Sequence, residues 1–260
     1  MRLALLMAIL ISILLPARLQ AEPAGDESRP VLIELFTSEG CSSCPPADSW
    51  LQQLDRRQPV SGARLIVLSE HVDYWDYQGW RDPYSSSQLT ARQAGYVRAL
   101  SLGAAATPQF IIDGATGFNG AAQQMLEVLR RAAAAAKLRV QIVSARVDPN
   151  NRALLRAHVV IDATGSTRDA DVYAAIALEH AESHVAGGEN SGRQLTHVAV
   201  VESLSRLGTV VRGGAFDRDV EIKLKPAQLA GGFRLVVFVQ QPGPGPVVGA
   251  AQQALVMSGG

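Results

Sequence analysis

The sequence predicts an α/β domain followed by a β-rich, sandwich-like domain. The first prediction rests on short apolar runs that alternate with amphipathic segments over residues 31–136, a pattern typical of a sheet covered by helices. The second rests on strand-like runs at short spacing after Lys137, with turn residues such as Asp148-Pro149-Asn150 between some of them. We therefore place the two domains at residues 29–137 and 138–260.

The N-terminus has the pattern of a secretory signal peptide. Met1-Arg2 precedes an apolar run from Leu3 to Leu15, and the small residue Ala21 follows. This pattern assigns residues 1–21 to a signal peptide and residues 22–28 to a polar leader. The apolar run is short for a bilayer, which makes an uncleaved anchor the weaker alternative. We expect a periplasmic or secreted mature protein without a membrane span, in a compartment where disulfides persist.

The charge balance argues against two classes of partner. Lys and Arg together number 24, as do Asp and Glu, and no basic stripe runs along the sequence. A neutral chain of this kind is a poor match for nucleic acid or for an anionic membrane surface. We expect no nucleic-acid partner.

The spacing of apolar residues defines the elements of the first domain. Three apolar runs predict buried strands, and three segments with apolar residues at helical spacing predict helices. The strands are predicted at residues 31–36, 64–69 and 110–113, and the helices at residues 47–54, 86–101 and 121–136. This alternating order predicts that the first two strands are parallel.

The second domain contains five runs that predict strands. They lie at residues 138–147, 153–163, 171–181, 219–225 and 233–240. Residues 197–207 are compatible with one short helix. Glu189, Asn190 and Arg193 are candidates for a polar patch where the two domains meet, and the alternative is a loop held by its own hydrogen bonds.

Three histidines of the second domain invite a metal-site interpretation. His180 and His184 are separated by three residues, with His197 beyond them. Metal-binding pairs at that separation usually lie on a helix, whereas His180 falls at the end of a predicted strand. We expect solvated loop histidines and no metal site.

The two cysteines of the chain, Cys41 and Cys44, form a C-x-x-C pair with three competing interpretations. A structural disulfide across so short a loop contributes only about 2 kcal/mol in the chain-entropy model, and a chain of this length has little need of it. Two cysteines supply half of a structural zinc site, although two-coordinate Cu(I) is an alternative. The third interpretation is a redox-active dithiol.

The position of the pair favours the redox interpretation. The cysteines follow a predicted buried strand and precede an amphipathic helix that begins with Pro45-Pro46. Cys41 is expected at the helix N-terminus, where the dipole and the unpaired N–H groups favour a thiolate, and Cys44 is expected to be the resolving thiol. Ser42 and Ser43 are uncharged hydrogen-bond donors to that thiolate and do not define a redox potential.

A second segment is expected beside the cysteines. The carboxyl ends of parallel strands meet at one edge of a sheet, so residues 69–80, after the second strand, are predicted neighbours of the pair. His71, Asp73, Tyr74 and Trp75 are candidates for a substrate-facing wall, and a cationic His71 would raise the thiolate fraction of Cys41. The alternative is a loop that packs its own aromatic side chains over a core.

These residues carry a resemblance to known proteins. The order strand, C-x-x-C, helix, strand, helix, Thr-Pro, strand and helix resembles a thioredoxin fold. More closely, "ELFTSEGCSSCPPAD", "HVDYWDYQGWRDP", "TPQFIIDG" and "GENSGRQLTH" resemble a family of secreted bacterial thioredoxin-like proteins of uncharacterised function. The resemblance covers most of residues 31–260. It implies an α/β thioredoxin-like fold followed by a β-rich, sandwich-like C-terminal domain.

The resemblance also implies roles for single residues. Pro108 matches a cis-proline that faces the dithiol, with Thr107 beside it, although spacing alone favours a trans bond. Glu34 matches a buried acid that relays protons to the resolving cysteine, but it lies one residue further from the cysteines than in that pattern. The alternative for Glu34 is an edge-strand side chain that faces water. Gly40 stands where better-known thioredoxins have Trp.

Together these observations predict an exported thiol–disulfide oxidoreductase. It would act on protein thiols or disulfides without a cofactor, and a redox partner that recycles the dithiol is a further candidate partner. The direction of electron flow is open. Two alternatives belong to other classes: a periplasmic Cu(I) carrier that uses the same cysteines, and a non-catalytic interaction protein whose C-x-x-C is a permanent disulfide.

Overall fold

The computed structural model describes residues 28–118, 122–225 and 232–255, so the predicted signal peptide and all of the leader except Ser28 lie outside the described residues. The helices are α1 (Pro45–Arg57), α2 (Ser87–Ala99) and α3 (Ala122–Ala134). The strands are β1 (Arg29–Thr37), β2 (Ala63–His71), β3 (Gln109–Ile112), β4 (Thr116–Phe118), β5 (Arg139–Val147), β6 (Leu154–Asp162), β7 (Ala170–His184), β8 (Gln194–Val210), β9 (Ala215–Lys223), β10 (Phe233–Gln240) and β11 (Val247–Leu255). None of the helices in these ranges is long and apolar enough to cross a membrane.

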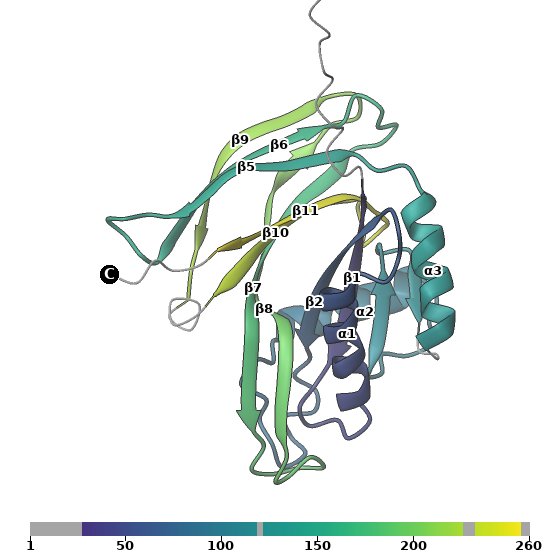
Figure 1. Cartoon of the computed structure of the whole chain (residues 1–260), viewed down its shortest axis with the longest axis vertical. Helices are drawn as coiled ribbons and strands as arrows, with labels where there is room; N and C mark the ends of the chain where they lie inside the picture. The colour runs from purple at the N-terminus through teal and green to yellow at the C-terminus, as the bar shows by residue number, and fades with distance from the viewer. Residues whose placement is uncertain (1–27, 119–121, 226–231, 256–260) are drawn as a thin grey trace, which may run out of the picture.

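Most of the strands belong to one mixed sheet. Its order is β11-β10-β7-β8-β2-β1-β3-β4. β1 runs parallel to β2, as the sequence predicts, and antiparallel to β3. β8 pairs with β7 in antiparallel fashion and meets β2 through the parallel pair of Ser69 and Val200. A second sheet, β5-β6-β9, packs over β7, β10 and β11 (Figure 1).

The predicted fold class is wrong. The sequence predicts an α/β thioredoxin-like domain followed by a separate sandwich-like domain, whereas the described residues form eleven strands and only three helices. Both halves of the chain contribute strands to the same eight-stranded sheet. Residues 197–207, which are compatible with a short helix by sequence, lie within the 17-residue strand β8 that joins the halves. Apolar spacing identifies strands locally, but it does not show which strand edges pair.

Individual elements nevertheless lie where the sequence predicts them. The three helices overlap the three predicted helical segments, and β1, β2 and β3 overlap the three predicted strands of the first half. A change from helix to strand also occurs near the predicted boundary, because α3 ends at Ala134 and β5 begins at Arg139. The local pattern is therefore confirmed, while the division into two packing units is not.

Strand β10 lies between two hydrophobic cores. Its residues Val236 and Phe238 face a core shared with β1, β2, α1 and α3. Leu235 and Val237 point to the opposite face, into a core shared with β5, β6 and β9. All eight residues of β10 are buried, and each large apolar side chain contributes about 1.5–3 kcal/mol on full burial. One strand thus supports both cores, so the two halves of the chain depend on each other.

Candidate functional site

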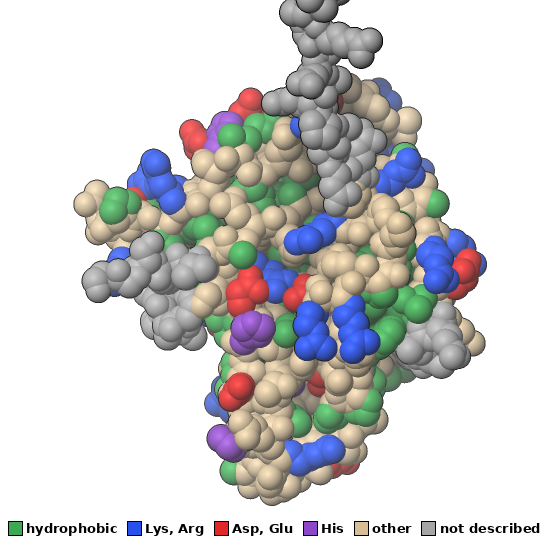
Figure 2. Space-filling view, viewed as in Figure 1, with side chains coloured by type: hydrophobic (Ala, Val, Ile, Leu, Met, Phe, Trp, Pro, Cys, Tyr) green, Lys and Arg blue, Asp and Glu red, His purple; other side chains and the backbone are tan. Residues whose placement is uncertain are grey.

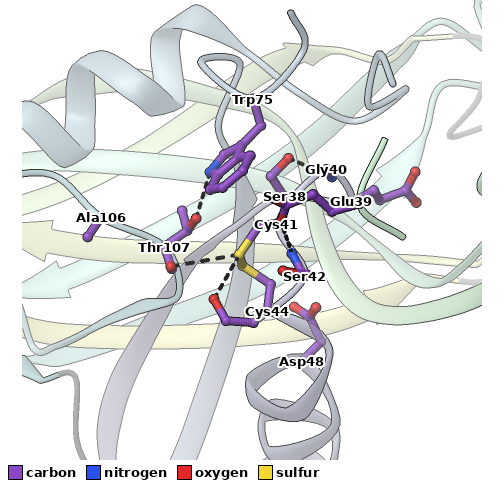
Figure 3. Close-up of a disulfide and its surroundings, with 12 residues drawn as sticks. Ser38, Glu39, Gly40, Cys41, Ser42, Cys44, Asp48, Trp75, Ala106 and Thr107 are labelled. Atoms are coloured by element: carbon purple, nitrogen blue, oxygen red, sulfur yellow. Dashed lines mark hydrogen bonds between the residues drawn. A yellow bond between two sulfur atoms is a disulfide. The ribbon is translucent and has the colours of Figure 1, made fainter. Parts of the chain in front are cut away.

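A disulfide joins Cys41 to Cys44 between the end of β1 and the start of α1 (Figure 3). Cys44 is the N-cap residue of α1, and Pro45 and Pro46 occupy the first two helical positions, where a missing N–H group loses no helical hydrogen bond. Cys41 lies in the preceding turn, and its carbonyl oxygen accepts a hydrogen bond from the Cys44 N–H at 3.2 Å. The predicted helix that begins with two prolines is confirmed, but Cys44 rather than Cys41 lies at its N-terminus.

The Cys41 sulfur faces the segment before β3. Its Sγ lies 3.4 Å from Ser43 Oγ and 3.7 Å from the Thr107 carbonyl oxygen. The Thr107–Pro108 peptide bond is cis. Trp75 Nε1 donates a hydrogen bond to Thr107 Oγ1 at 2.8 Å. Of the predicted site residues, the structure therefore gathers Ser43, Trp75 and Thr107 around the disulfide (Figure 3).

The loop between β7 and β8, residues 185–193, binds the backbone of the C-x-x-C turn from the other half of the chain. Asn190 Nδ2 donates hydrogen bonds to the carbonyl oxygens of Glu39 and Cys41, at 2.8 and 2.9 Å. Asn190 and both cysteines have a relative exposure of 0%. In this conformation a large partner therefore cannot reach either sulfur, and the loop fixes the backbone of the turn that carries them.

The same loop confirms the polar patch predicted between the two halves. Glu189 Oε2 accepts a hydrogen bond from the Ser42 backbone N–H at 3.1 Å, and Arg193 Nη1 donates to Asn190 Oδ1 at 2.8 Å. Hydrogen bonds from Ser42 lower the pKa of the Glu189 carboxyl. Ser42, inside the C-x-x-C motif, is thus held by a residue from the C-terminal half.

His71 forms a buried ion pair with Asp82. Its Nδ1 lies 2.7 Å from Asp82 Oδ2, and both side chains are fully buried. Burial by itself lowers the pKa of His71, but the Asp82 charge and hydrogen bond outweigh it and raise that pKa. Burial raises the pKa of Asp82, yet the His71 charge prevails and lowers it. Asp82 Oδ2 also accepts a hydrogen bond from the Glu39 N–H at 2.8 Å, which fixes the backbone two residues before Cys41.

Asp73 and Tyr74 hold the segment after β2 against α2. Thr90 Oγ1 donates a hydrogen bond to Asp73 Oδ1 at 2.6 Å, and the Tyr74 hydroxyl donates to Gln93 Oε1 at 3.2 Å. Burial raises the pKa of Tyr74, so its hydroxyl keeps the proton that it donates. Asp73 makes its side-chain hydrogen bond to α2. Tyr74 also interacts with the Thr107 side chain and so, like Trp75, reaches the disulfide surroundings.

Glu34 is buried within a charged cluster that links β1, α2 and β10. Arg92 Nε donates to Glu34 Oε1 at 2.5 Å, and the Tyr96 hydroxyl donates to Glu34 Oε2 at 2.7 Å. Arg92 Nη1 also donates to Gln240 Oε1 at 3.1 Å. Burial and then the Glu34 charge raise the pKa of neighbouring Glu70 well above its usual range. Glu34 thus does not face water, and its hydrogen bonds go to Arg92 and Tyr96 rather than to Cys44.

Sequence reasoning missed two buried residues near the disulfide, Asp48 and His197. Asp48 lies in the first turn of α1 and is 6% exposed. Its position three residues before the buried Leu51 was a signal, because that spacing places it on the apolar face of the helix. His197 is 3% exposed on β8, so the predicted solvated loop histidine is wrong at this position. In the part of the chain that the structure describes, no group of three or more His, Cys, Asp or Glu side chains is arranged to bind a metal ion.

Comparison with known proteins places the chain in a family. A family model described as "Protein of unknown function (DUF1223)" matches residues 32–240. The chain belongs to the DUF1223 family. The resemblance to a family of uncharacterised function is therefore confirmed for this DUF1223 protein, while the secretion that the resemblance implies stays a prediction. No curated protein matches the chain.

Two solved structures resemble this DUF1223 protein. A crystal structure of an Agrobacterium tumefaciens protein is 26% identical, with 89% of this chain and 95% of that chain covered and a TM-score of 0.63. HBP35 of Porphyromonas gingivalis is 17% identical, with 88% of this chain and 76% of that chain covered and a TM-score of 0.65. The second likeness shows a shared fold alone.

Proposed function

We propose that this protein is an exported thiol–disulfide oxidoreductase that exchanges electrons with protein thiols or disulfides. The observation that carries the proposal is the Cys41–Cys44 disulfide at the start of α1, with Cys41 Sγ turned toward the Thr107 carbonyl oxygen and the cis Thr107–Pro108 bond. Export rests on the signal-peptide pattern of residues 1–21. In an exported protein the disulfide persists unless a specific reductant acts on it.

The exchange proceeds through a mixed disulfide. In the reduced protein, the Cys41 thiolate attacks one sulfur of a partner disulfide, the partner S–S bond breaks, and its other sulfur leaves as a thiolate. The Cys44 thiolate then attacks the Cys41 sulfur, which re-forms the intramolecular disulfide and releases the second partner thiolate. The partner gains two electrons and the protein dithiol loses them. The reverse sequence oxidises a partner dithiol, and neither direction needs a cofactor.

The surroundings of Cys41 suit the thiolate form. Ser43 Oγ, at 3.4 Å from Sγ, is a hydrogen-bond donor for a thiolate. The dipole of α1 also favours negative charge, but most strongly at Cys44, the N-cap residue. The Thr107 carbonyl oxygen at 3.7 Å is an acceptor and favours the protonated thiol instead. Support for Cys41 as the attacking residue therefore rests on the Ser43 contact and on the position of its Sγ beside Thr107 and the cis Thr107–Pro108 bond.

The burial of both sulfurs makes the exchange dependent on a local opening. Since neither cysteine has exposed surface, a partner must displace part of the surrounding chain before it contacts Cys41. We assign this movement to residues 185–193, which bind the backbone of the motif. The same burial supports one competing function, a non-catalytic interaction protein in which the Asn190 hydrogen bonds seal a permanent disulfide. The two functions differ in whether a folded partner ever reaches the sulfur.

Mixed-disulfide trapping separates the two functions. A Cys44→Ser variant lacks the resolving thiol, so it accumulates covalent complexes through Cys41 when it is exported in cells. We expect complexes that a reductant dissolves and that mass spectrometry assigns to Cys41. The matched control is Cys41→Ser, in which the remaining cysteine is the N-cap residue and traps far fewer partners. Equal, negligible trapping by both variants would favour the permanent disulfide.

A further inference from the structure

A second cluster of ionisable side chains lies behind the disulfide, on its β8 side. Five buried residues from five separate stretches of the chain meet there. They are Glu39, Asp48, His71, Asp82 and His197, with relative exposures of 0%, 6%, 0%, 2% and 3%. Proteins seldom gather so many ionisable groups away from water without a functional reason.

His197 occupies the middle of this cluster. Its Nε2 lies 3.3 Å from Glu39 Oε1, and its Nδ1 lies 4.0 Å from Asp48 Oδ1. Its ring packs against the His71 ring, with the centroids 4.7 Å apart and the planes at 82°. The cluster is therefore continuous from Asp48 through His197 to Glu39. The His71–Asp82 ion pair adjoins it through the contact between the His71 and His197 rings.

Several polar atoms that face one another in the cluster lack hydrogen-bond partners among the residues that the structure describes. This holds for Asp48 Oδ1, Glu39 Oε1, His71 Nε2 and both ring nitrogens of His197. An unsatisfied buried polar atom costs about 1–3 kcal/mol, and most such atoms in proteins are paired. A set of unpaired acceptors and ring nitrogens at short range is suited to groups that take up and release protons.

Asp48 connects this cluster to Cys44. The Asp48 N–H donates to the Cys44 carbonyl oxygen at 3.1 Å, and helix positions four residues apart lie on one face with Cβ atoms about 5–6 Å apart. Figure 3 shows the Asp48 carboxylate on the Cys44 side of the disulfide. The Cys44 sulfur has no exposed surface, so a proton that leaves its thiol must pass to a protein group.

The other end of the cluster opens into a groove between α1 and β8. Side chains from both elements line this groove: Asp48, Ser49, Gln52, Leu195, Thr196 and His197. Gln52 Nε2 donates to the Thr196 carbonyl oxygen at 2.7 Å and bridges the two elements. Beyond it, acidic, basic and histidine side chains gather over α1 and the β7–β8 hairpin (Figure 2). The groove is a route by which solvent reaches His197 and Asp48.

We propose that Asp48 accepts the thiol proton of Cys44 during the resolving step and that His197 passes this proton on to the groove between α1 and β8. The inference rests on the proposed thiol–disulfide exchange. In the mixed disulfide, the S–H bond of Cys44 breaks and the proton joins Asp48 Oδ1. The Cys44 thiolate then attacks the Cys41 sulfur, the bond from Cys41 to the partner breaks, and the partner leaves as a thiolate. The proton moves from Asp48 to His197 Nδ1 and then to water.

The charges around Asp48 suit this exchange of a proton. Burial raises the pKa of its carboxyl, the charges of His197 and His71 and the hydroxyl of Thr37 lower it, and Asp82 raises it again. These groups face Asp48 from β8, β2, β1 and the segment after β2. A carboxyl whose pKa lies above its usual range is a better match for a thiol proton. Since the base is the ionised form, the resolving step accelerates as pH rises through the Asp48 ionisation.

A two-phase reaction of the full-length mature protein tests the proposal. Reduced protein mixed with dithiobis-nitrobenzoate releases one coloured thiolate when Cys41 attacks, at a rate that depends on reagent concentration. It releases a second coloured thiolate when Cys44 resolves the mixed disulfide. The rate of this second phase does not depend on reagent concentration. We expect Asp48→Asn to leave the first phase unchanged and to slow the second at least tenfold near neutral pH, within the range for lost general-base catalysis. The shortfall should close as pH approaches the pKa of the Cys44 thiol itself.

Two further variants make the outcome specific. His197→Gln should slow the second phase by a smaller factor, and Asp219→Asn, a matched change of a 94% exposed side chain on β9, should change neither phase. A second phase that Asp48→Asn leaves unaltered at every pH overturns the proton route alone. A wild-type protein without a first phase overturns the proposed exchange, and the route with it.

If Asp48→Asn does not fold, the pH dependence of the second-phase rate of the wild-type protein tests the proton route instead. The thiol pKa of Cys44 is measured separately in a Cys41→Ser protein. A wild-type second-phase rate whose pH profile has a separate inflection below that thiol pKa supports Asp48 as the acceptor. A profile whose only inflection is that of the thiol itself overturns it.

Discussion

The Asn190 side chain donates a hydrogen bond to the Cys41 carbonyl oxygen at 2.9 Å across 149 residues of sequence. The C-terminal half of the chain therefore holds the C-x-x-C turn directly. Because Asn190 and the cysteines are fully buried, we expect the reactivity of the disulfide to depend on how often the β7–β8 loop opens.

Loss of the Asn190 side-chain hydrogen bonds should make the disulfide more accessible to a reductant. Asn190→Ala leaves the carbonyl oxygens of Glu39 and Cys41 without their side-chain donor, at a cost of about 1–3 kcal/mol to the closed loop. We expect the disulfide to react with dithiothreitol about tenfold faster, since 1.4 kcal/mol corresponds to a tenfold change in the open population. The measurement is the rate of thiol appearance under native conditions.

The loop provides its own control for this change. Ser191 Oγ bonds only within the loop, to the Ala186 carbonyl oxygen at 3.3 Å, so Ser191→Ala should leave the rate of reduction unchanged. If Asn190→Ala also leaves the rate unchanged while the protein stays folded, the loop does not control access to the disulfide.

The His71–Asp82 pair should stabilise the protein in a defined pH window. The folded pKa of His71 lies above 6.5, so its contribution is complete below pH 6.5 and is lost as pH rises through the folded value. The folded pKa of Asp82 lies below 3.8, so its contribution is present above pH 3.8 and is lost as pH falls through the folded value. The pair thus contributes most between these two limits.

His71→Gln should lower the free energy of unfolding by about 3–5 kcal/mol near pH 5.5, because it leaves a buried Asp82 charge unpaired. Urea unfolding of both proteins at about pH 5.5 and pH 9 measures the difference, which should shrink at the higher pH. His158→Gln is the control, since His158 meets Asp219 at 2.9 Å on an exposed surface and should cost less than about 1 kcal/mol. A loss for His71→Gln that grows toward pH 9 would contradict the assignment.

Glu70 should limit stability at neutral pH. Among the described residues, neither of its carboxylate oxygens has a hydrogen-bond partner, and Arg92 Nε lies 3.6 Å from its Oε1. Burial, then the Glu34 charge, nevertheless raises the pKa of Glu70 well above 4.5. The folded protein thus retains a proton that the unfolded chain releases above pH 4.5, so stability falls as pH rises from there through the folded pKa. A neutral Glu70→Gln side chain avoids this loss.

We expect Glu70→Gln to match the wild-type free energy of unfolding near pH 4.5 and to exceed it by roughly 1–3 kcal/mol near pH 8. Chemical denaturation at both values provides the measurement. Glu127→Gln, at a position with 59% side-chain exposure on α3, should show no such pH dependence. A Glu70→Gln protein that is less stable than wild type near pH 8 would show that the charged form is the native one.

The sequence predicts the disulfide site better than the fold. The strand before Cys41 and the proline-started helix after Cys44 are local features, and the spacing of apolar residues is sufficient to place them. The topology depends on β8, which apolar spacing does not reveal. Its pairing with β7 contains two register shifts, and the stretch from His197 to Val201 is buried on both faces, so the alternation typical of a strand is interrupted there.

The sequence fails to predict the roles of Asp48 and His197 for the same reason. His197 lies close to Asp48 only because β8 runs beside α1 and β2, and that neighbourhood cannot be derived from an order of elements in the chain. For Glu34, one of the two sequence-based alternatives is a buried acid, and the structure confirms its burial. Its partners Arg92 and Tyr96 come from α2, however, and cannot be derived from β1 alone. Long-range pairing, rather than residue type, decides which carboxylate stands beside the cysteines.

The reduction potential of the Cys41–Cys44 pair tests the central claim most directly. Equilibration of the protein with glutathione or dithiothreitol buffers, followed by alkylation and mass spectrometry, gives its value. A pair that exchanges with partner proteins should have a potential between about −270 and −120 mV, the range of known thiol–disulfide catalysts. A potential below about −300 mV, typical of structural disulfides in secreted proteins, would contradict the proposed activity and leave the C-x-x-C as a permanent bond.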